Sequence, residues 1–152
     1  MTLTKRIGGF GGSMSRAVSL RPGGTINLSV GLSPGDALSR GYEGQQLQSY
    51  LTTNNGYFSL STGYTINITV PNGYWLGGDA TTGYHALDLS GFYKFDTINI
   101  YNYGFIMGAY GVGGAGGTGN NSGSGGTYAS HGIYASNCNA QVNLYNYSTG
   151  MI

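Results

Sequence analysis

Residues 97–108 read Thr-Ile-Asn-Ile-Tyr-Asn-Tyr-Gly-Phe-Ile-Met-Gly, and this stretch carries the strongest indication of the fold. Its first half alternates aliphatic side chains with polar ones, which is typical of a strand that buries one face. Ile98 and Ile100 then lie on one side of the strand, and Asn99 and Tyr101 on the other. Gly104 follows closely and indicates a turn. We therefore expect a strand from Thr97 that buries its two isoleucines.

The same pattern recurs in three other segments, at residues 25–30, 65–70 and 142–145. The copies start about 30 to 45 residues apart, which is too irregular for a propeller or a leucine-rich solenoid. The sequence thus predicts a reused unit of strand, turn and strand. Its expected core consists of the aliphatic residues of the four copies, namely Ile26, Leu28, Ile66, Ile68, Val70, Ile98, Ile100, Val142 and Leu144.

The composition argues against helices as the main element. Of 152 residues, 30 are glycine and 14 are tyrosine, with only 6 basic and 5 acidic side chains. Glycine costs a helix about 1 kcal/mol relative to alanine, and strong helix formers such as Glu and Lys are nearly absent. The pair Asn72-Gly73 is a strong signal for a tight turn. We expect an all-β fold of short antiparallel strands, arranged as a sandwich or a prism.

Residues 104–126 form a glycine-rich segment that contains 11 glycines in 23 residues. Gly108, Gly111, Gly114 and Gly117 recur at every third residue, which is the period of a polyproline-II-like helix. We expect an extended, polyglycine-II-like segment held by many neighbours, or else a flexible one. The predicted organisation is an extended basic and glycine-rich arm (1–24), a β domain (25–103), the glycine-rich segment (104–126) and a C-terminal β segment (127–152) that packs on the domain.

Motifs for catalysis and cofactor binding are weak. Residues 111–116 match G-x-G-x-x-G, yet no helix can follow them and no acidic residue after Asp96 could hold a ribose. Asp79, His85 and Asp88 could hold a metal or supply a base, but they lack regular ligand spacing and a surface loop is the favoured interpretation. His131 and Cys138 have no catalytic triad around them. We expect no enzyme activity, no cofactor and no metal.

Charge and hydropathy exclude further classes. The net charge is only +1 at pH 7, so a nucleic-acid surface is not expected. No apolar run has the length of a signal peptide or a membrane span, and Cys138 is the single cysteine. We expect a soluble, unsecreted chain made in a reducing cytosol. The basic N-terminal segment is interpreted as a solvated tail, with docking to an acidic partner as the alternative.

The aromatic residues indicate binding as well as packing. Tyr combined with Ser, Gly and Asn is typical of binding loops, because rigid rings supply contact area at low entropic cost. We expect Trp75, Phe92 and Phe95 in the core. For Tyr103, Tyr110 and Tyr128, which flank the glycine-rich segment, contact with a partner is as plausible as packing.

The segment 95–152 resembles the glycine-rich tips of tailed-bacteriophage receptor-binding proteins, such as the distal adhesins of T-even phages and tail-tip fibre proteins of lambda-like phages. A fainter copy spans residues 65–78. In those proteins a strand with Asn and Gly leads into I-x-G and then into glycine-rich runs. The matching positions here are Asn99, Asn102, Gly104, Ile106 and Gly108.

This resemblance implies a virion protein, made in the cytoplasm of a host bacterium, that acts as a homotrimer and contacts other virion proteins. As an adhesin it would bind a bacterial surface glycan or an outer-membrane protein. Five residues are the predicted receptor-binding set: Tyr103, Tyr110, Asn120, Asn121 and Tyr128. Four N-terminal residues are predicted assembly contacts: Lys5, Arg6, Phe10 and Arg16.

Two alternatives stay open. A short all-β virion protein could decorate a capsid or connect virion parts, and the basic N-terminal arm suits such docking. A weaker likeness, carried by Gly108-Ala-Tyr-Gly111 and a later Gly-Thr, is to jacalin-type lectins.

Overall fold

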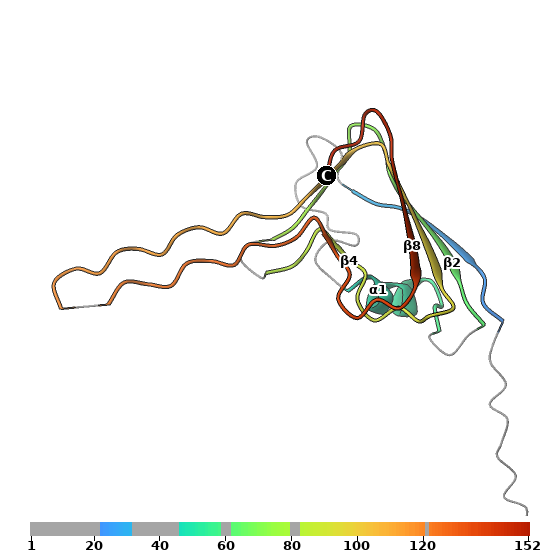
Figure 1. The fold of residues 1–152 in the computed structure, drawn as a ribbon, viewed down its shortest axis with the longest axis horizontal. Coiled ribbons are helices and arrows are strands. Elements are labelled where there is room, and N and C mark those ends of the chain that lie inside the picture. Colours follow the sequence, from blue (N-terminus) through green and yellow to red (C-terminus); the bar gives the residue numbers. More distant parts are fainter. Residues whose placement is uncertain (1–21, 32–45, 59–61, 80–82, 121) are drawn as a thin grey trace, which may run out of the picture.

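The computed structural model describes residues 22–31, 46–58, 62–79, 83–120 and 122–152 (Figure 1). Its main sheet has four strands in the order β1-β2-β5-β8, formed by Thr25–Ser29, Thr65–Val70, Thr97–Asn102 and Gln141–Asn146. Two smaller sheets pair β3 (Trp75–Gly77) with β6 (Phe105–Met107), and β4 (Leu87–Asp88) with β7 (Ile133–Tyr134). One helix, α1, spans Leu47–Asn54.

The chain visits the three sheets in a fixed order and so winds as a parallel solenoid. One coil contains β2, β3 and β4, and the next contains β5, β6 and β7. The flanking coils also join this stack, since Gln46 forms a bridge to Asp88 and Met151 forms one to Phe105. Each coil therefore stacks on the one before it, and the repeated segments lie next to each other in the main sheet.

The predicted all-β class is confirmed, but the predicted antiparallel pairing is wrong. All pairings between the named strands of the described residues are parallel. The register is exact, since Ile66 lies opposite Ile26 in β1 and Ile98 in β5. The reason is that successive copies are connected by a whole coil instead of a hairpin. The tight turn at Asn72-Gly73 makes a corner between β2 and β3, which belong to different sheets.

The core lies inside the coils, and most of its predicted members are confirmed. The isoleucines of β2 and β5 and Val70 are fully buried, and Ile26 is nearly so. Leu28 is partly buried against the same cluster. Val142 and Leu144 are wrong as core residues, because they are 39% and 47% exposed. They lie on β8, the last strand of the main sheet, and no described strand pairs with its outer edge.

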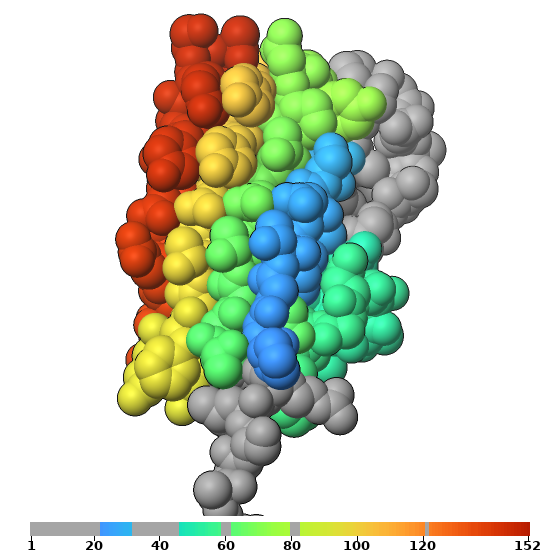
Figure 2. All heavy atoms as spheres, turned by 90° about the vertical axis from the view of Figure 1, so that its right-hand side faces the viewer, coloured from blue at the N-terminus to red at the C-terminus, as the bar shows by residue number. Residues whose placement is uncertain are grey.

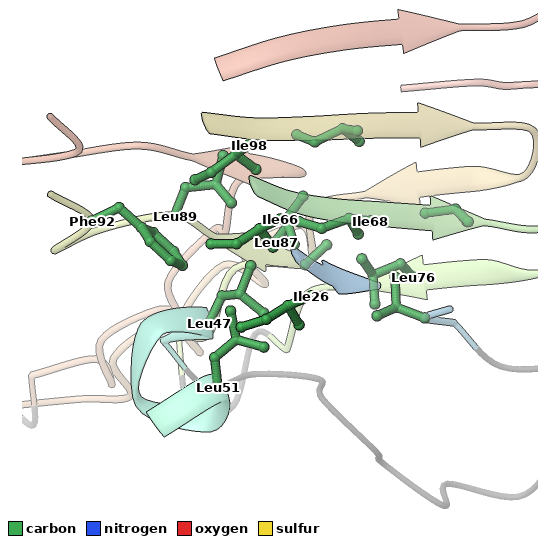
Figure 3. Close-up of a cluster of buried hydrophobic side chains, with 14 of the residues drawn as sticks. Ile26, Leu47, Leu51, Ile66, Ile68, Leu76, Leu87, Leu89, Phe92 and Ile98 are labelled. Carbon is green, nitrogen blue, oxygen red and sulfur yellow. The ribbon is translucent and has the colours of Figure 1, made fainter. Parts of the chain in front are cut away.

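Helix α1 covers the other end of the core. Its Leu47 and Leu51 are fully buried and lie beside Ile26 of β1 (Figure 3). These leucines are four residues apart, so they occupy the same face of the helix. The composition argued against helices as main elements, and this single helix is short enough to agree with that expectation.

The three aromatic residues predicted for the core have different outcomes. Phe92 is fully buried, as predicted, and its ring makes an edge contact with Tyr57. Trp75 and Phe95 are 37% and 49% exposed, so those two predictions are wrong. In β3 the inward position belongs to Leu76, which leaves its neighbour Trp75 outside. Phe95 lies on the surface beneath the Lys94 ammonium group, 4.9 Å from its ring centroid.

Candidate functional site

A long arm projects from the solenoid between β6 and β7. Figure 1 shows its two segments leaving the stack side by side, well beyond the sheets. The preceding coil has a shorter connection at the same place, between β3 and β4, where Asp79 forms an antiparallel bridge with Tyr84. The arm is therefore an extended version of a connection that both coils contain.

Hydrogen bonds join the two segments of the arm at every third residue. The backbone N–H groups of Ser130, Thr127 and Ser124 donate to the carbonyl oxygens of Ala109, Val112 and Ala115 at 2.8, 2.9 and 3.0 Å. In return, the backbone N–H groups of Ala109, Val112 and Ala115 donate to the side-chain hydroxyl oxygens of Ser130, Thr127 and Ser124 at 2.7 to 2.9 Å. Each step thus forms a closed pair of bonds between one small residue and one hydroxyl residue.

Glycine is required on the inner side of this arm. A Cβ atom at Gly108 or Gly114 would overlap the carbonyl oxygen of Ser130 or Ser124, and one at Gly111 would lie 2.6 Å from that of Thr127. The glycine period noted in the sequence therefore reflects the close approach of the second segment. The matching period of Ser124, Thr127 and Ser130 was missed, although it is readable in the sequence.

Two of the predicted receptor-binding residues are prominent on the arm. Tyr110 and Tyr128 are 81% and 79% exposed, the highest exposures among the large hydrophobic residues of the described segments. They lie at the same level of the arm, because both fall between two hydrogen-bonded pairs, Ala109 with Ser130 and Val112 with Thr127. Asn120 is exposed in the turn that follows Gly119, whose φ is +63°. Asn121 lies outside the described residues.

Tyr103 is placed elsewhere, beside the main sheet. Its ring stacks on that of Tyr147 with centroids 4.1 Å apart and an interplanar angle of 8°. Tyr101 stacks on Tyr145 in the same manner, at 5.1 Å and 9°. Hydrogen bonding to the Tyr147 side chain raises the pKa of Tyr103. Tyr103 and Tyr110 are therefore not brought together as one site, and the two stacked pairs join β5 and its following turn to the last coil.

A ladder of asparagine side chains crosses the outer face of the main sheet. Asn143 donates to Asn99, Asn99 to Asn67 and Asn67 to Asn27, with N···O distances of 2.9, 2.9 and 2.8 Å. The alternation in the sequence predicts a polar face for Asn67 and Asn99, and only the structure shows that they bond to each other. The signal was present, because every copy of the repeat carries Asn between its two aliphatic residues.

Two histidines meet at the base of the arm. The Nδ1 atoms of His85 and His131 are 3.3 Å apart, and the His131 backbone N–H also donates to His85 Nδ1 at 3.1 Å. Tyr134 packs on His85 with ring centroids 4.0 Å apart. Burial, and next the charge of His131, lower the pKa of His85, while Asp88 acts in the opposite direction. Among the described residues, no three His, Cys, Asp or Glu side chains are grouped so as to hold a metal.

Of the residues predicted to lie in a surface loop, Asp88 instead belongs to β4, and its carboxylate accepts the backbone N–H of Ser90 at 2.9 Å. His85 lies in the irregular segment just before β4 and is partly exposed. His131 was considered with Cys138, although its contact is with His85, 46 residues away. This separation is one turn of the solenoid, so only the coil stacking reveals the pair.

A buried carboxylate serves the fold. Asp96 is 2% exposed and accepts hydrogen bonds from the Tyr57 hydroxyl at 2.6 Å and from the backbone N–H groups of Tyr93 and Tyr64 at 3.0 and 2.9 Å. Burial, and next the hydrogen bond to Asp96, raise the pKa of Tyr57 above its ordinary value. Asp96 thus anchors the chain at the start of β5, and no sequence motif marks it.

The predicted assembly contacts Lys5, Arg6, Phe10 and Arg16 lie outside the described residues. Within the part of the chain that the structure describes, no helix is both long and apolar enough to cross a membrane. No family model, no curated protein and no solved structure matches this chain.

Proposed function

We propose that this chain is a bacteriophage virion protein, a tail-fibre or tail-tip adhesin, which contacts a host surface receptor through its projecting arm. The observation that carries the proposal is the pair of exposed tyrosines, Tyr110 and Tyr128, on an arm that extends away from the stacked coils. The sequence resemblance to phage adhesin tips covers the same segment. A homotrimer, implied by that resemblance, stays a prediction.

The arm suits presentation of these rings at a distance from the solenoid. Its three-residue period and paired hydrogen bonds support a polyglycine-II-like geometry for both segments. Such cross-bonding offsets part of the entropy lost when glycines are ordered. The arm therefore holds Tyr110 and Tyr128 in place without a hydrophobic core of its own.

The chemistry of the arm favours an uncharged ligand. No Lys, Arg, Asp or Glu occurs after Asp96, so electrostatic steering of a charged ligand is absent from this part of the chain. Tyrosine rings stack on apolar faces while their hydroxyls and the Asn120 amide form hydrogen bonds. A neutral surface glycan or a polar loop of an outer-membrane protein fits these groups.

Adsorption to bacteria tests the proposal. The purified protein is expected to bind host cells, and a variant without residues 112–126 is expected to lose binding while keeping its β-rich circular dichroism. The double variant Tyr110→Ala, Tyr128→Ala should reduce binding by at least tenfold. Tyr74→Ala, at a tyrosine 36% exposed but away from the arm, is the matched control and should bind normally. Equal binding by all variants would contradict a role for the arm.

The same assay separates the alternatives. Binding to purified capsids without binding to cells would support a decoration or connector protein. Binding of free sugars by a stable monomer would support the lectin-like alternative. In both cases the N-terminal residues Lys5, Arg6, Phe10 and Arg16 can be tested by substitution, because adhesin binding through the arm does not require them.

A further inference from the structure

The second segment of the arm rejoins the solenoid at His131, where two hydrogen bonds hold it to the preceding coil. The His131 backbone carbonyl accepts the N–H of Ala86 at 2.9 Å, as in an ordinary parallel ladder. The His131 backbone N–H instead donates to a side chain, the His85 imidazole, at 3.1 Å. This second bond depends on the protonation of one ring, because histidine changes its charge between about pH 5 and pH 8 and a carbonyl does not.

The contact assigns the roles of the two ring nitrogens of His85. Because a backbone N–H can only donate, Nδ1 is the unprotonated acceptor and Nε2 carries the hydrogen in the neutral ring. The Nδ1 atom of the His131 ring lies 3.3 Å from the same acceptor. Protonation of His85 places a hydrogen on Nδ1, so the acceptor becomes a donor that faces the His131 N–H.

The groups around the two histidines come from β4 and β7. Tyr134 of β7 packs on His85 with ring centroids 4.0 Å apart, and on His131 at 5.3 Å. Burial, and next the charge of His131, lower the pKa of His85, while Asp88 of β4 acts in the opposite direction. When both imidazoles are protonated, two positive charges face each other across the contact. Acidic pH therefore removes the acceptor and adds repulsion at the same place.

The arm and the main sheet lie on different sides of the solenoid. Figure 1 shows the arm leaving on one side, and Figure 2, viewed from the other, shows the four strands of the main sheet next to one another. Ser130, the neighbour of His131, already belongs to the hydrogen-bonded pairs of the arm. Loss of the His131 contact therefore acts at the base of the arm, away from the buried strand β5.

We propose that His85 is a pH-sensitive latch for the arm. At neutral pH its Nδ1 atom binds the His131 N–H and fixes the second segment of the arm to the preceding coil. At acidic pH the protonated ring faces that N–H with a donor of its own, and the base of the arm detaches at this point. The backbone and hydroxyl groups that pair the two segments do not titrate in this range, so the arm itself stays paired. The latch does not depend on what the arm binds.

Amide hydrogen exchange measured by NMR tests the latch at single residues. Between pH 7.5 and pH 5, the protection factor of the His131 amide, corrected for the intrinsic exchange rate, should fall by about fivefold or more. The amides of Thr127 in the arm and Ile100 in β5 are internal references and should keep their protection. His85→Gln supplies an acceptor oxygen at every pH, so protection at His131 should then be independent of pH. Unchanged protection in the wild-type protein, or an equal fall in His85→Gln, would overturn the proposal.

A second variant separates the roles of the two histidines of the chain. His131→Gln keeps the backbone N–H and the His85 acceptor but removes the neighbouring positive charge. The fall in protection at this amide should persist, with its midpoint at a higher pH. If protection became independent of pH in His131→Gln, repulsion between the rings would control the contact, and the latch at His85 would be overturned.

Spin labels measure the position of the arm itself. In a Cys138→Ala background, labels at Asn120→Cys and Thr65→Cys report the distance from the turn of the arm to the exposed face of β2. The distribution of this distance should be broader at pH 5 than at pH 7.5. With His85→Gln added, the two distributions should coincide. Coinciding distributions in the protein that retains His85 would contradict release of the arm.

Discussion

At the scale of single residues, the asparagine ladder shows how one repeated side chain connects the coils. Asn67 donates to Asn27 and accepts from Asn99, and Asn99 accepts from Asn143. Each inner amide therefore uses a donor and an acceptor along the stack. Because the strands are parallel and in register, the same side chain meets itself in every coil, which is the geometry such amide ladders require.

We predict that Asn99→Ala lowers the free energy of unfolding by about 1–3 kcal/mol, since it breaks two bonds of the ladder and leaves Asn67 and Asn143 without their partner. Urea unfolding followed by circular dichroism measures the change. Thr97→Ala, on the same strand and face but outside the ladder, is the control and is expected to cost less. An equal loss for the two variants would contradict a specific contribution of the ladder.

The histidine pair predicts a pH dependence of stability. The pKa of His85 is lowered below 6.5 in the folded protein, so the unfolded chain binds a proton more readily. Stability from this group is complete above about pH 6.5 and is lost as the pH falls toward the folded pKa. The midpoint of thermal unfolding should thus decrease between pH 7 and pH 5. His85→Gln should flatten this decrease, and an unchanged slope would contradict the assignment.

At the scale of elements, the arm depends on which of its glycines face the opposite segment. Gly108, Gly111 and Gly114 face its carbonyl groups, whereas Gly113 and Gly116 have open space where a Cβ atom would lie. The arm is therefore a paired structure in which glycine is needed only at positions that face the opposite segment. This distinction follows from the pairing and is invisible in the composition.

We predict opposite effects for Gly114→Ala and Gly116→Ala. The first places a Cβ atom on the Ser124 carbonyl oxygen and should open the distal part of the arm. The second meets no atom and should preserve the arm, or stabilise it slightly because alanine restricts the unfolded chain. Amide hydrogen exchange at Ala115 and Ser124 measures this difference. Equal protection in the two variants would contradict the paired arrangement.

At the scale of the whole molecule, the two outer strands of the main sheet, β1 and β8, differ in the burial of their aliphatic side chains. Helix α1 packs on the core beside β1, where Ile26 is only 7% exposed, whereas Val142 and Leu144 of β8 are 39% and 47% exposed. Stability of such a stack comes from contacts between neighbouring coils. The helix should therefore contribute more than its short length suggests.

We predict that Leu51→Ala costs about 2–5 kcal/mol of stability, the usual range for removing a fully buried leucine. Thr53→Ala, on the exposed side of the same helix, should cost less than about 1 kcal/mol. Denaturant unfolding of both variants gives the comparison. If the two costs were alike, α1 would not be the element that closes the core.

The strands and their inward faces were predictable because they depend on local alternation. Ile66, Ile68, Ile98 and Ile100 were assigned to the core from this pattern, and all four are fully buried. The direction of pairing was not predicted, since alternation is identical in parallel and antiparallel sheets. The long separation between repeats was the available signal, because a hairpin needs only a few connecting residues whereas parallel strands need a crossover.

The candidate site was predictable only in part. Tyr110, Asn120 and Tyr128 share the arm because the sequence places them around one glycine-rich segment. Tyr103 immediately precedes that segment, yet it stacks on Tyr147 beside the main sheet. His85 and His131 gave no joint signal, because one whole coil separates them.

The sequence by itself determined the β-rich class, the buried face of each strand and the three-residue period of the glycines, since these follow from the geometry of a few consecutive residues. Only the tertiary structure decided that the strands run parallel, that Asn27, Asn67, Asn99 and Asn143 form one ladder, and that Val142 and Leu144 are exposed. Those features depend on which coil stacks on which and where the stack ends. A pattern within one strand carries no information about its neighbours across the sheet.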